Sequence, residues 1–158
     1  MANSEHPAVS KVLADLAGHG LHPEVTWFDN ATTTAEAAAA SLGIDVGQIA
    51  NSLVFTLDQE PILVLTSGAH RVDADWFGAQ LGGTIGRASK ELVREATGQV
   101  IGGVAPVGHP QQVRTFVDSA LQGYSEVWAA AGHPKTVLPL TYDQLLTVTG
   151  GTATAVRP

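Results

Sequence analysis

The segment ATGQVIGGVAPVGH, from Ala96 to His109, combines four glycines with a proline and several apolar residues. Surface loops are seldom this apolar, and core strands are seldom this rich in glycine. Glycine allows another backbone or a ligand to approach closely. The sequence therefore predicts a buried segment whose backbone is open at Gly102 and Gly103. Either a ligand site or a plain bulge in a strand accounts for the pair.

A ligand site here would use backbone N–H groups. Consecutive donors at Gly102 and Gly103 can hold a carbonyl oxygen, as an oxyanion hole does. Val100, Ile101 and Val104 would supply apolar walls. The segment contains no G-x-G-x-x-G and no Gly-Lys-Ser/Thr, so neither a dinucleotide fingerprint nor a Walker motif is present.

The composition indicates one domain spanning residues 1–158. The chain is long enough and apolar enough, at 44% hydrophobic residues, to bury a core. It has no cysteine, which excludes disulfides and thiolate metal sites and fits a cytoplasmic protein. We expect neither a signal peptide nor a membrane partner, because the N-terminus and the apolar runs lack the required patterns.

The charge argues against a general nucleic-acid binder. The formal net charge is −7, and the eight Lys and Arg residues are scattered along the chain. A DNA-binding protein would show a basic patch, so no DNA partner is expected. A pocket that takes only one end of a nucleic acid remains compatible with this charge.

Capping residues and apolar spacing predict the helices. Thr33 followed by Glu36 indicates a capping box, and Asp73, Ser89 and Thr141 are N-cap candidates. The predicted helices cover residues 7–18, 35–43, 74–82, 90–97 and 142–150.

Short alternating or apolar segments predict strands between these helices. They cover residues 24–28, 49–57, 61–66, 113–117, 126–131, 136–140 and 152–156, and the turn DQEP joins the second to the third. This order indicates a single α/β domain with a mixed, curved, barrel-like sheet and surrounding helices.

The order of the segments resembles that of a known family. IANSLVF, ILVLTSGAHRVD, EATGQVIGGVAPVGH and VWAAAGHP follow one another as in the YbaK/prolyl-tRNA synthetase-associated editing domain family. The resemblance covers roughly Thr34 to Val156 and is strongest in the glycine-rich segment. It implies a trans-editing aminoacyl-tRNA deacylase that hydrolyses the ester of a small mischarged amino acid, with Cys- or Ala-tRNA(Pro)-like substrates.

The resemblance also implies a site and partners. The Gly-Gly-x-x-Pro loop, which includes Val104 and Pro106, would lie beside the aminoacyl pocket. The partners would be the aminoacyl-tRNA 3′ end and a synthetase or elongation factor that delivers it. No cofactor is implied, and the six histidines show no metal-ligand spacing.

One position departs from the family pattern. Active members carry a lysine on the first central strand, where this chain has Asn51. Asparagine can donate and accept hydrogen bonds but brings no positive charge. The alternatives are that Asn51 positions the ribose or α-amino group, that Arg71 or Arg87 supplies the cation, or that Asn51 is an ordinary polar strand residue.

Further candidate residues surround this position. Ser52, Thr66 and Ser67 offer hydroxyls for substrate binding, but no G-x-S-x-G elbow supports a serine nucleophile. His109 can orient water or simply bond to backbone. Asp118 can help build the pocket or cap a helix.

Two functions follow from these residues. The first is a deacylase in which Asn51, Gly102 and Gly103 form the catalytic centre and water attacks the ester. The second is a catalytically inactive small-molecule or aminoacyl-binding module of the same fold, which has lost activity with the lysine.

Overall fold

A hairpin of two long strands forms the centre of the fold. The computed structural model describes residues 6–31 and 34–158, and in it β2 (Ile49–Leu57) pairs antiparallel with β3 (Glu60–Ser67). Asp58 and Gln59 join them with φ angles of 49° and 76°. Positive φ at both central residues is typical of the tight turns that match the twist of paired strands. The predicted strand pair and its turn are confirmed.

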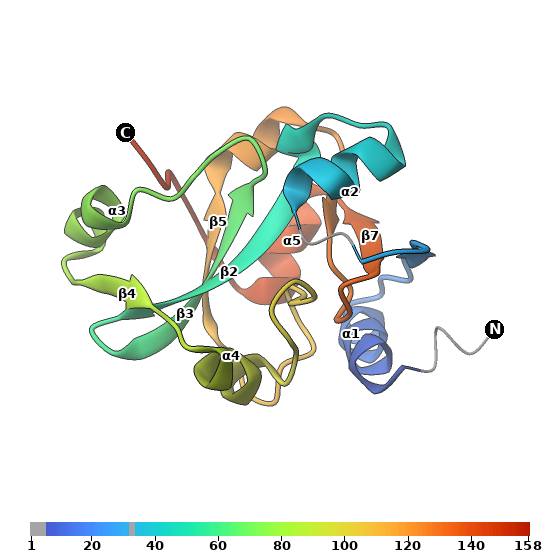
Figure 1. Cartoon of the computed structure of the whole chain (residues 1–158), viewed down its shortest axis with the longest axis horizontal. Coiled ribbons are helices and arrows are strands. Elements are labelled where there is room, and N and C mark those ends of the chain that lie inside the picture. The colour runs from blue at the N-terminus through green and yellow to red at the C-terminus, as the bar shows by residue number, and fades with distance from the viewer. Residues whose placement is uncertain (1–5, 32–33) are drawn as a thin grey trace.

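The sheet extends outward from both sides of this hairpin (Figure 1). Among the described residues, the strand order is β1-β7-β6-β2-β3-β5-β8, and β4 pairs with β2 off this path. Parallel pairs (β2 with β6, β3 with β5, β5 with β8) and antiparallel pairs both occur. The mixed α/β class is confirmed, but the sheet is not closed into a barrel, because β1 and β8 form separate ends. The remaining strands are β1 (Thr26–Trp27), β4 (Ile85–Arg87), β5 (Arg114–Asp118), β6 (Val127–Ala129), β7 (Thr136–Leu140) and β8 (Thr152–Thr154).

The helices begin at the capping residues that the sequence indicated. The side chains of Asp73, Ser89 and Thr141 each accept a backbone N–H of the first helical turn. Thr33 lies outside the described residues, and the N-cap of its helix is Thr34. The described α-helices are α1 (Pro7–Gly18), α2 (Ala35–Leu42), α3 (Ala74–Leu81), α4 (Lys90–Thr97) and α5 (Tyr142–Thr149). None of them is both long and apolar enough to cross a membrane.

Three short elements were not predicted. β4 contains only Ile85–Arg87 and exists because it pairs with residues 55–57 of β2. Two 3-10 helices, η2 (Val46–Gln48) and η3 (Ser119–Gly123), lead into β2 and out of β5. The first predicted strand is shorter than expected, because only Thr26 and Trp27 pair with β7.

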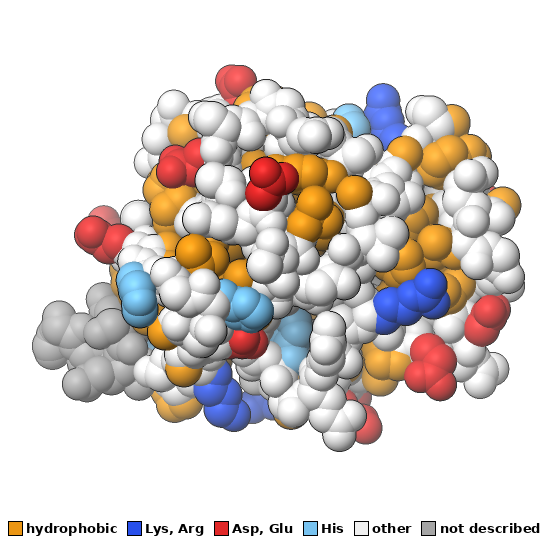
Figure 2. All heavy atoms as spheres, turned by 180° about the vertical axis from the view of Figure 1, so that it is seen from behind, with side chains coloured by type: hydrophobic (Ala, Val, Ile, Leu, Met, Phe, Trp, Pro, Cys, Tyr) orange, Lys and Arg blue, Asp and Glu red, His pale blue; other side chains and the backbone are white. Residues whose placement is uncertain are grey.

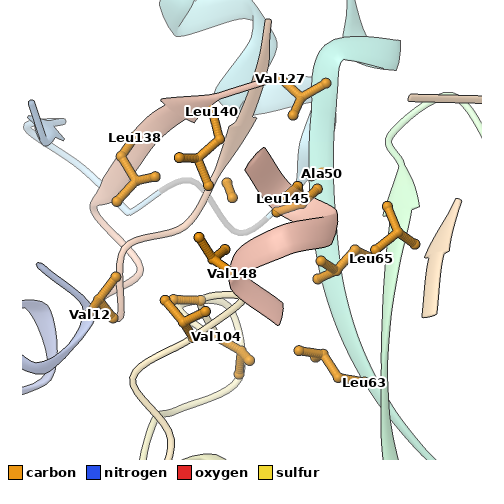
Figure 3. Close-up of a cluster of buried hydrophobic side chains, with 14 of the residues drawn as sticks. Val12, Ala50, Leu63, Leu65, Val104, Val127, Leu138, Leu140, Leu145 and Val148 are labelled. Atoms are coloured by element: carbon orange, nitrogen blue, oxygen red, sulfur yellow. The ribbon is translucent and has the colours of Figure 1, made fainter. Parts of the chain in front are cut away.

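Apolar side chains fill both faces of the central hairpin. On one face, Leu145 and Val148 of α5 converge with Leu63 and Leu65 of β3 and with Val104 of the glycine-rich loop (Figure 3). A second cluster around α3 covers the other face and includes Leu57, Ile62, Val64, Phe77 and Phe116. Val104, Ala105 and Val107 of the glycine-rich loop therefore belong to the main core, whereas the predicted burial is wrong at Val100 and Ile101, which are exposed.

The middle of β2 has one open edge. β6 pairs only with Ile49 and Ala50, and β4 pairs only with residues 55–57. Ile49 O accepts a hydrogen bond from Gly68 N at 2.8 Å, on the side of β3. Because backbone groups alternate in direction along a strand, those of Ser52 and Val54 point to the opposite side. Within the described chain no strand covers that side, which leaves a gap between β6 and β4.

Candidate functional site

A cavity of about 280 Å³ lies at the open edge of β2. Its walls come from the start of α2, the whole middle of β2, α4, the glycine-rich loop and the ends of β6 and β7. Most of the wall is apolar, and alanines at five positions keep the side chains there small. The lining residues are Thr34, Ala35, Ala38, 49–55, Ala88, Val93, Ile101, Gly102, Val104, Trp128, Ala130, Thr136 and Val137.

Ser52 lines this cavity, and its hydroxyl is packed beneath the cavity wall. Its Oγ is buried and has no hydrogen-bond partner among the described residues. A buried hydroxyl without a partner costs about 1–3 kcal/mol, so the group is expected to meet a ligand or water. Side chains alternate along a strand, so Ser52 lies on the same face of β2 as Ala50 and Val54, toward the main core.

Asn51 projects from the opposite face of the same strand. It is exposed, and its register partner on β3 is Thr66. The cavity is lined by both Asn51 and Ser52 because it reaches around the open strand edge. Thr66 does not line it, although its buried Oγ1 also has no partner among the described residues.

The two loop glycines have different roles in the structure. Gly102 lines the cavity and has a φ angle of +91°. Gly103 is buried, and its N–H donates to Val100 O at 2.9 Å. The expectation of two free N–H groups is therefore wrong at Gly103, because a turn hydrogen bond already occupies that donor. A Cβ on Gly103 would lie 2.7 Å from the carbonyl carbon of His133, so this glycine permits two backbone segments to touch.

A buried glutamine holds the loop in place. Gln99 Oε1 accepts the N–H of Ala105 at 2.7 Å, and Gln99 Nε2 donates to Val107 O at 3.2 Å. Thr97 Oγ1, in turn, accepts the N–H of Gln99 at 3.1 Å. Sequence reasoning missed Gln99, because its role depends on how the chain returns after Gly103.

Ser67 and Asp118 belong to a separate network. Asp118 is 1% exposed, and its carboxylate accepts the N–H of Ser67 and the Nδ1–H of His70, each at 3.0 Å. It also accepts Ala120 N–H at the start of η3, which is the capping role that the sequence left open. Ser67 Oγ donates to Gly47 O at 2.9 Å. Neither Ser67 nor Asp118 lines the cavity.

Pro106 and His109 line another hollow, of about 320 Å³, beside α1 and α5. His109 Nε2–H donates to Ala105 O at 2.8 Å, which is the backbone role considered for it. Burial lowers the pKa of His109, against smaller opposing effects of that carbonyl and of Asp15. Histidines lie near one another on the back of the molecule, where acidic side chains are spread widely (Figure 2).

Neither arginine that was considered as a replacement cation reaches the cavity. Arg71 and Arg87 are exposed and do not line it. Among the described lining residues there is no Lys or Arg at all. The large aromatic side chain in the wall is that of Trp128. The cavity is thus neutral and mostly apolar, with hydrogen-bonding groups on β2, on the loop and at the start of α2.

Comparison with known proteins identifies the family. The aminoacyl-tRNA editing domain matches residues 29–148, so the chain belongs to the aminoacyl-tRNA editing domain family. This match includes all the segments that line the cavity, and it confirms the resemblance seen in the sequence.

Three of the similar proteins match this chain over most of their own length. A proposed trans-editing enzyme for prolyl-tRNA synthetase has 38% identity and a TM-score of 0.90, over 97% of this chain and 98% of its own. YwhH of Bacillus subtilis, an uncharacterized protein, is 30% identical over 77% of this chain and 78% of its own. EbsC of Enterococcus faecalis, a proposed Cys-tRNA(Pro)/Cys-tRNA(Cys) deacylase, is 27% identical over 81% and 79%. Proline–tRNA ligases also match, but the chain spans only 15% to 18% of their length.

Proposed function

We propose that this protein is a trans-editing deacylase that hydrolyses the ester between a small mischarged amino acid and its tRNA. The observation that carries the proposal is the unpartnered Ser52 hydroxyl at the wall of a small, mostly apolar cavity of a chain that belongs to the editing-domain family. Alanines at positions 38, 50, 88 and 130 leave room for a side chain of limited size.

The site supports hydrolysis by water. The cavity would take the amino acid, with its carbonyl oxygen near the Ser52 hydroxyl and the Gly102 N–H. Gly102 N–H has no acceptor among the described residues, and its φ of +91° suits a backbone that faces a ligand. Hydrogen-bond donors that are already positioned in a site with little water stabilise the oxyanion of the tetrahedral intermediate. Asn51, at the open edge, would orient the ribose or the α-amino group.

Cys- and Ala-tRNA(Pro) are the proposed substrates. A hydrophobic pocket discriminates poorly between such small side chains, at about 1–3 kcal/mol per methylene, so a separate hydrolytic step increases accuracy. EbsC supports cysteine, since it is named for Cys-tRNA(Pro) and Cys-tRNA(Cys). A synthetase or an elongation factor would deliver the tRNA, because the net charge of −7 disfavours binding by the protein alone.

A catalytically inactive binding module is the second candidate. The observation that favours it is the neutral cavity, in which Asn51 stands at the family's lysine position. Such a module would keep the pocket and bind the aminoacyl group without cleaving the ester.

Hydrolysis of a panel of mischarged tRNAs separates the two. Purified protein is incubated with Cys-, Ala- and Pro-charged tRNA(Pro), and ester loss is followed with and without the Asn51→Lys substitution. Faster loss of Cys- or Ala-tRNA(Pro) by the unaltered protein supports the deacylase. If the unaltered protein hydrolyses none of the esters while still binding them, the protein is the binding module.

A further inference from the structure

A second hollow, of about 440 Å³, shares the glycine-rich loop as a wall with the cavity described above. Its walls come from α4, from the first half of the loop, from the turn before β7, from the start of α1 and from Ala31. Residues that line it include Arg94, Gly98, Val100, His133 and Lys135.

The two hollows are neighbours, because the same segments line both. On α4, Val93 lines the cavity and Arg94 lines the second hollow. In the loop, residues 98–100 line the second hollow, whereas Ile101 and Gly102 line the cavity. The segment before β7 behaves in the same way, with residues 132–135 on one side and Thr136 and Val137 on the other.

Val100 and Ile101 form the ridge between the hollows. They are 40% and 56% exposed, which makes them the large apolar side chains that the described surface leaves open. Because one of them lines the cavity and the other lines the second hollow, the pair offers an apolar surface to a ligand that extends from one to the other. The flat face of a nucleic-acid base is a suitable partner, since it is apolar and every base presents one.

The second hollow carries the positive charge that the cavity lacks. Arg94 and Lys135 both line it, and in the described part of the chain neither has a carboxylate within 4.0 Å. The turn that presents Lys135 is fixed, because His133 Nδ1 accepts the N–H of Lys135 at 3.0 Å. The ring of His133 also lies 5.0 Å from that of Trp27. The backbone at Lys135 is therefore fixed near the cavity, and both basic side chains remain available to an anion.

We propose that this second hollow binds a phosphodiester of the last nucleotides of the tRNA, with Arg94 and Lys135 as its cations. The inference rests on the proposed function, because an aminoacyl ester in the cavity places the terminal ribose at its mouth. The first phosphodiester follows directly after that ribose. The nucleic-acid chain would cross the Val100–Ile101 ridge, and the two cations would supply the positive charge that the cavity lining lacks.

Two non-hydrolysable mimics test this subsite. One is 3′-alanylamino-3′-deoxyadenosine, which has no phosphate, and the other is the trinucleotide CCA ending in the same group. Binding of each is measured for the unaltered protein and for Arg94→Gln and Lys135→Gln. Lys90→Gln is the matched control, because Lys90 lies one turn earlier on α4 and lines neither hollow.

The unaltered protein should bind the trinucleotide more tightly than the nucleoside. Each test substitution should weaken trinucleotide binding about three- to tenfold and leave nucleoside binding unchanged. Each should also lower the slope of log affinity against log salt by about 0.7, the value for one phosphate contact on a single strand. The control should behave like the unaltered protein.

Three results would overturn the inference. Equal affinity of the unaltered protein for both mimics removes the phosphate subsite but leaves the aminoacyl site standing. Test variants that match Lys90→Gln, or that lose nucleoside binding equally, show that Arg94 and Lys135 do not contact phosphate. If the unaltered protein binds neither mimic, the proposed function itself fails, and the subsite fails with it.

Discussion

Replacing Gly103 by alanine should destabilise the fold by forcing two backbone segments apart. The added Cβ would lie 2.7 Å from His133 C, 2.7 Å from Pro134 N and 2.8 Å from His133 Cα. These are backbone atoms, so no side-chain rotation can relieve the contact. Overpacking typically costs about 1–3 kcal/mol, and the rigid neighbours place this substitution near 3 kcal/mol. The melting temperature should fall by about 6–12 °C, at 2–4 °C per kcal/mol for a chain of this size.

Denaturation by guanidinium chloride measures the effect, with Gly123→Ala as the matched control. A Cβ on Gly123 meets nothing within 4 Å, so the control should change the free energy of unfolding by less than about 0.5 kcal/mol. If the denaturation midpoint of Gly103→Ala equals that of the control, the contact with the neighbouring backbone does not resist the added Cβ. The same contact means that loss of activity in a Gly103→Val variant would not identify a catalytic role, because such a variant would also lose packing.

Three further substitutions test the buried polar groups. Thr66→Val removes a buried hydroxyl that has no partner in the described chain, so the free energy of unfolding should rise by about 1 kcal/mol in chemical denaturation. A decrease of similar size in that free energy would show that the hydroxyl is hydrogen-bonded. Asp118→Ala leaves the buried N–H of Ser67 without its acceptor and should lower the same quantity by about 3 kcal/mol, whereas a change below 1 kcal/mol would contradict the network. Burial lowers the pKa of His109 in the folded protein. As the pH falls below about 6.5, the imidazole is therefore protonated in the unfolded chain before it is protonated in the folded one. Unfolding free energy should therefore be constant above that pH and decrease below it. His109→Gln should flatten the decrease but not abolish it, since the pKa of His133 is also lowered; an unchanged slope would exclude His109 as a source.

Local signals in the sequence were sufficient for most of the secondary structure. Strand β2 has the predicted bounds because a run of mostly apolar residues and a tight turn define it without distant partners. Asp73 caps its helix as expected, since capping depends on residues within one turn. By contrast, β4 exists only through pairing with a strand nearly thirty residues earlier, and three residues carry too little pattern to reveal that pairing.

The candidate site was predictable only in part. Asn51, Ser52, Gly102 and Val104 line one cavity, and their role in substrate binding stays a prediction. The hydrogen bond at Gly103, by contrast, depends on the return of the chain, which no spacing of residues can show.

The separation of the other candidate residues has a similar cause. Thr66, Ser67 and Asp118 lie near β2 and β3 but outside the cavity, because a pattern of strands does not tell which face or edge stays open. The gap between β6 and β4 that forms the cavity is a property of the whole sheet.

Single-turnover deacylation by a variant with a larger side chain in the cavity tests most directly whether the ester is hydrolysed there. Ala130→Leu adds three carbons to a wall of the cavity, and Ala79→Leu adds the same group on the exposed surface of α3. We expect rapid loss of Cys- or Ala-tRNA(Pro) with the unaltered protein and with Ala79→Leu, and a rate at least about tenfold lower for Ala130→Leu, which corresponds to about 1.4 kcal/mol. Equal rates for the two folded variants would show that the ester is not hydrolysed in this cavity.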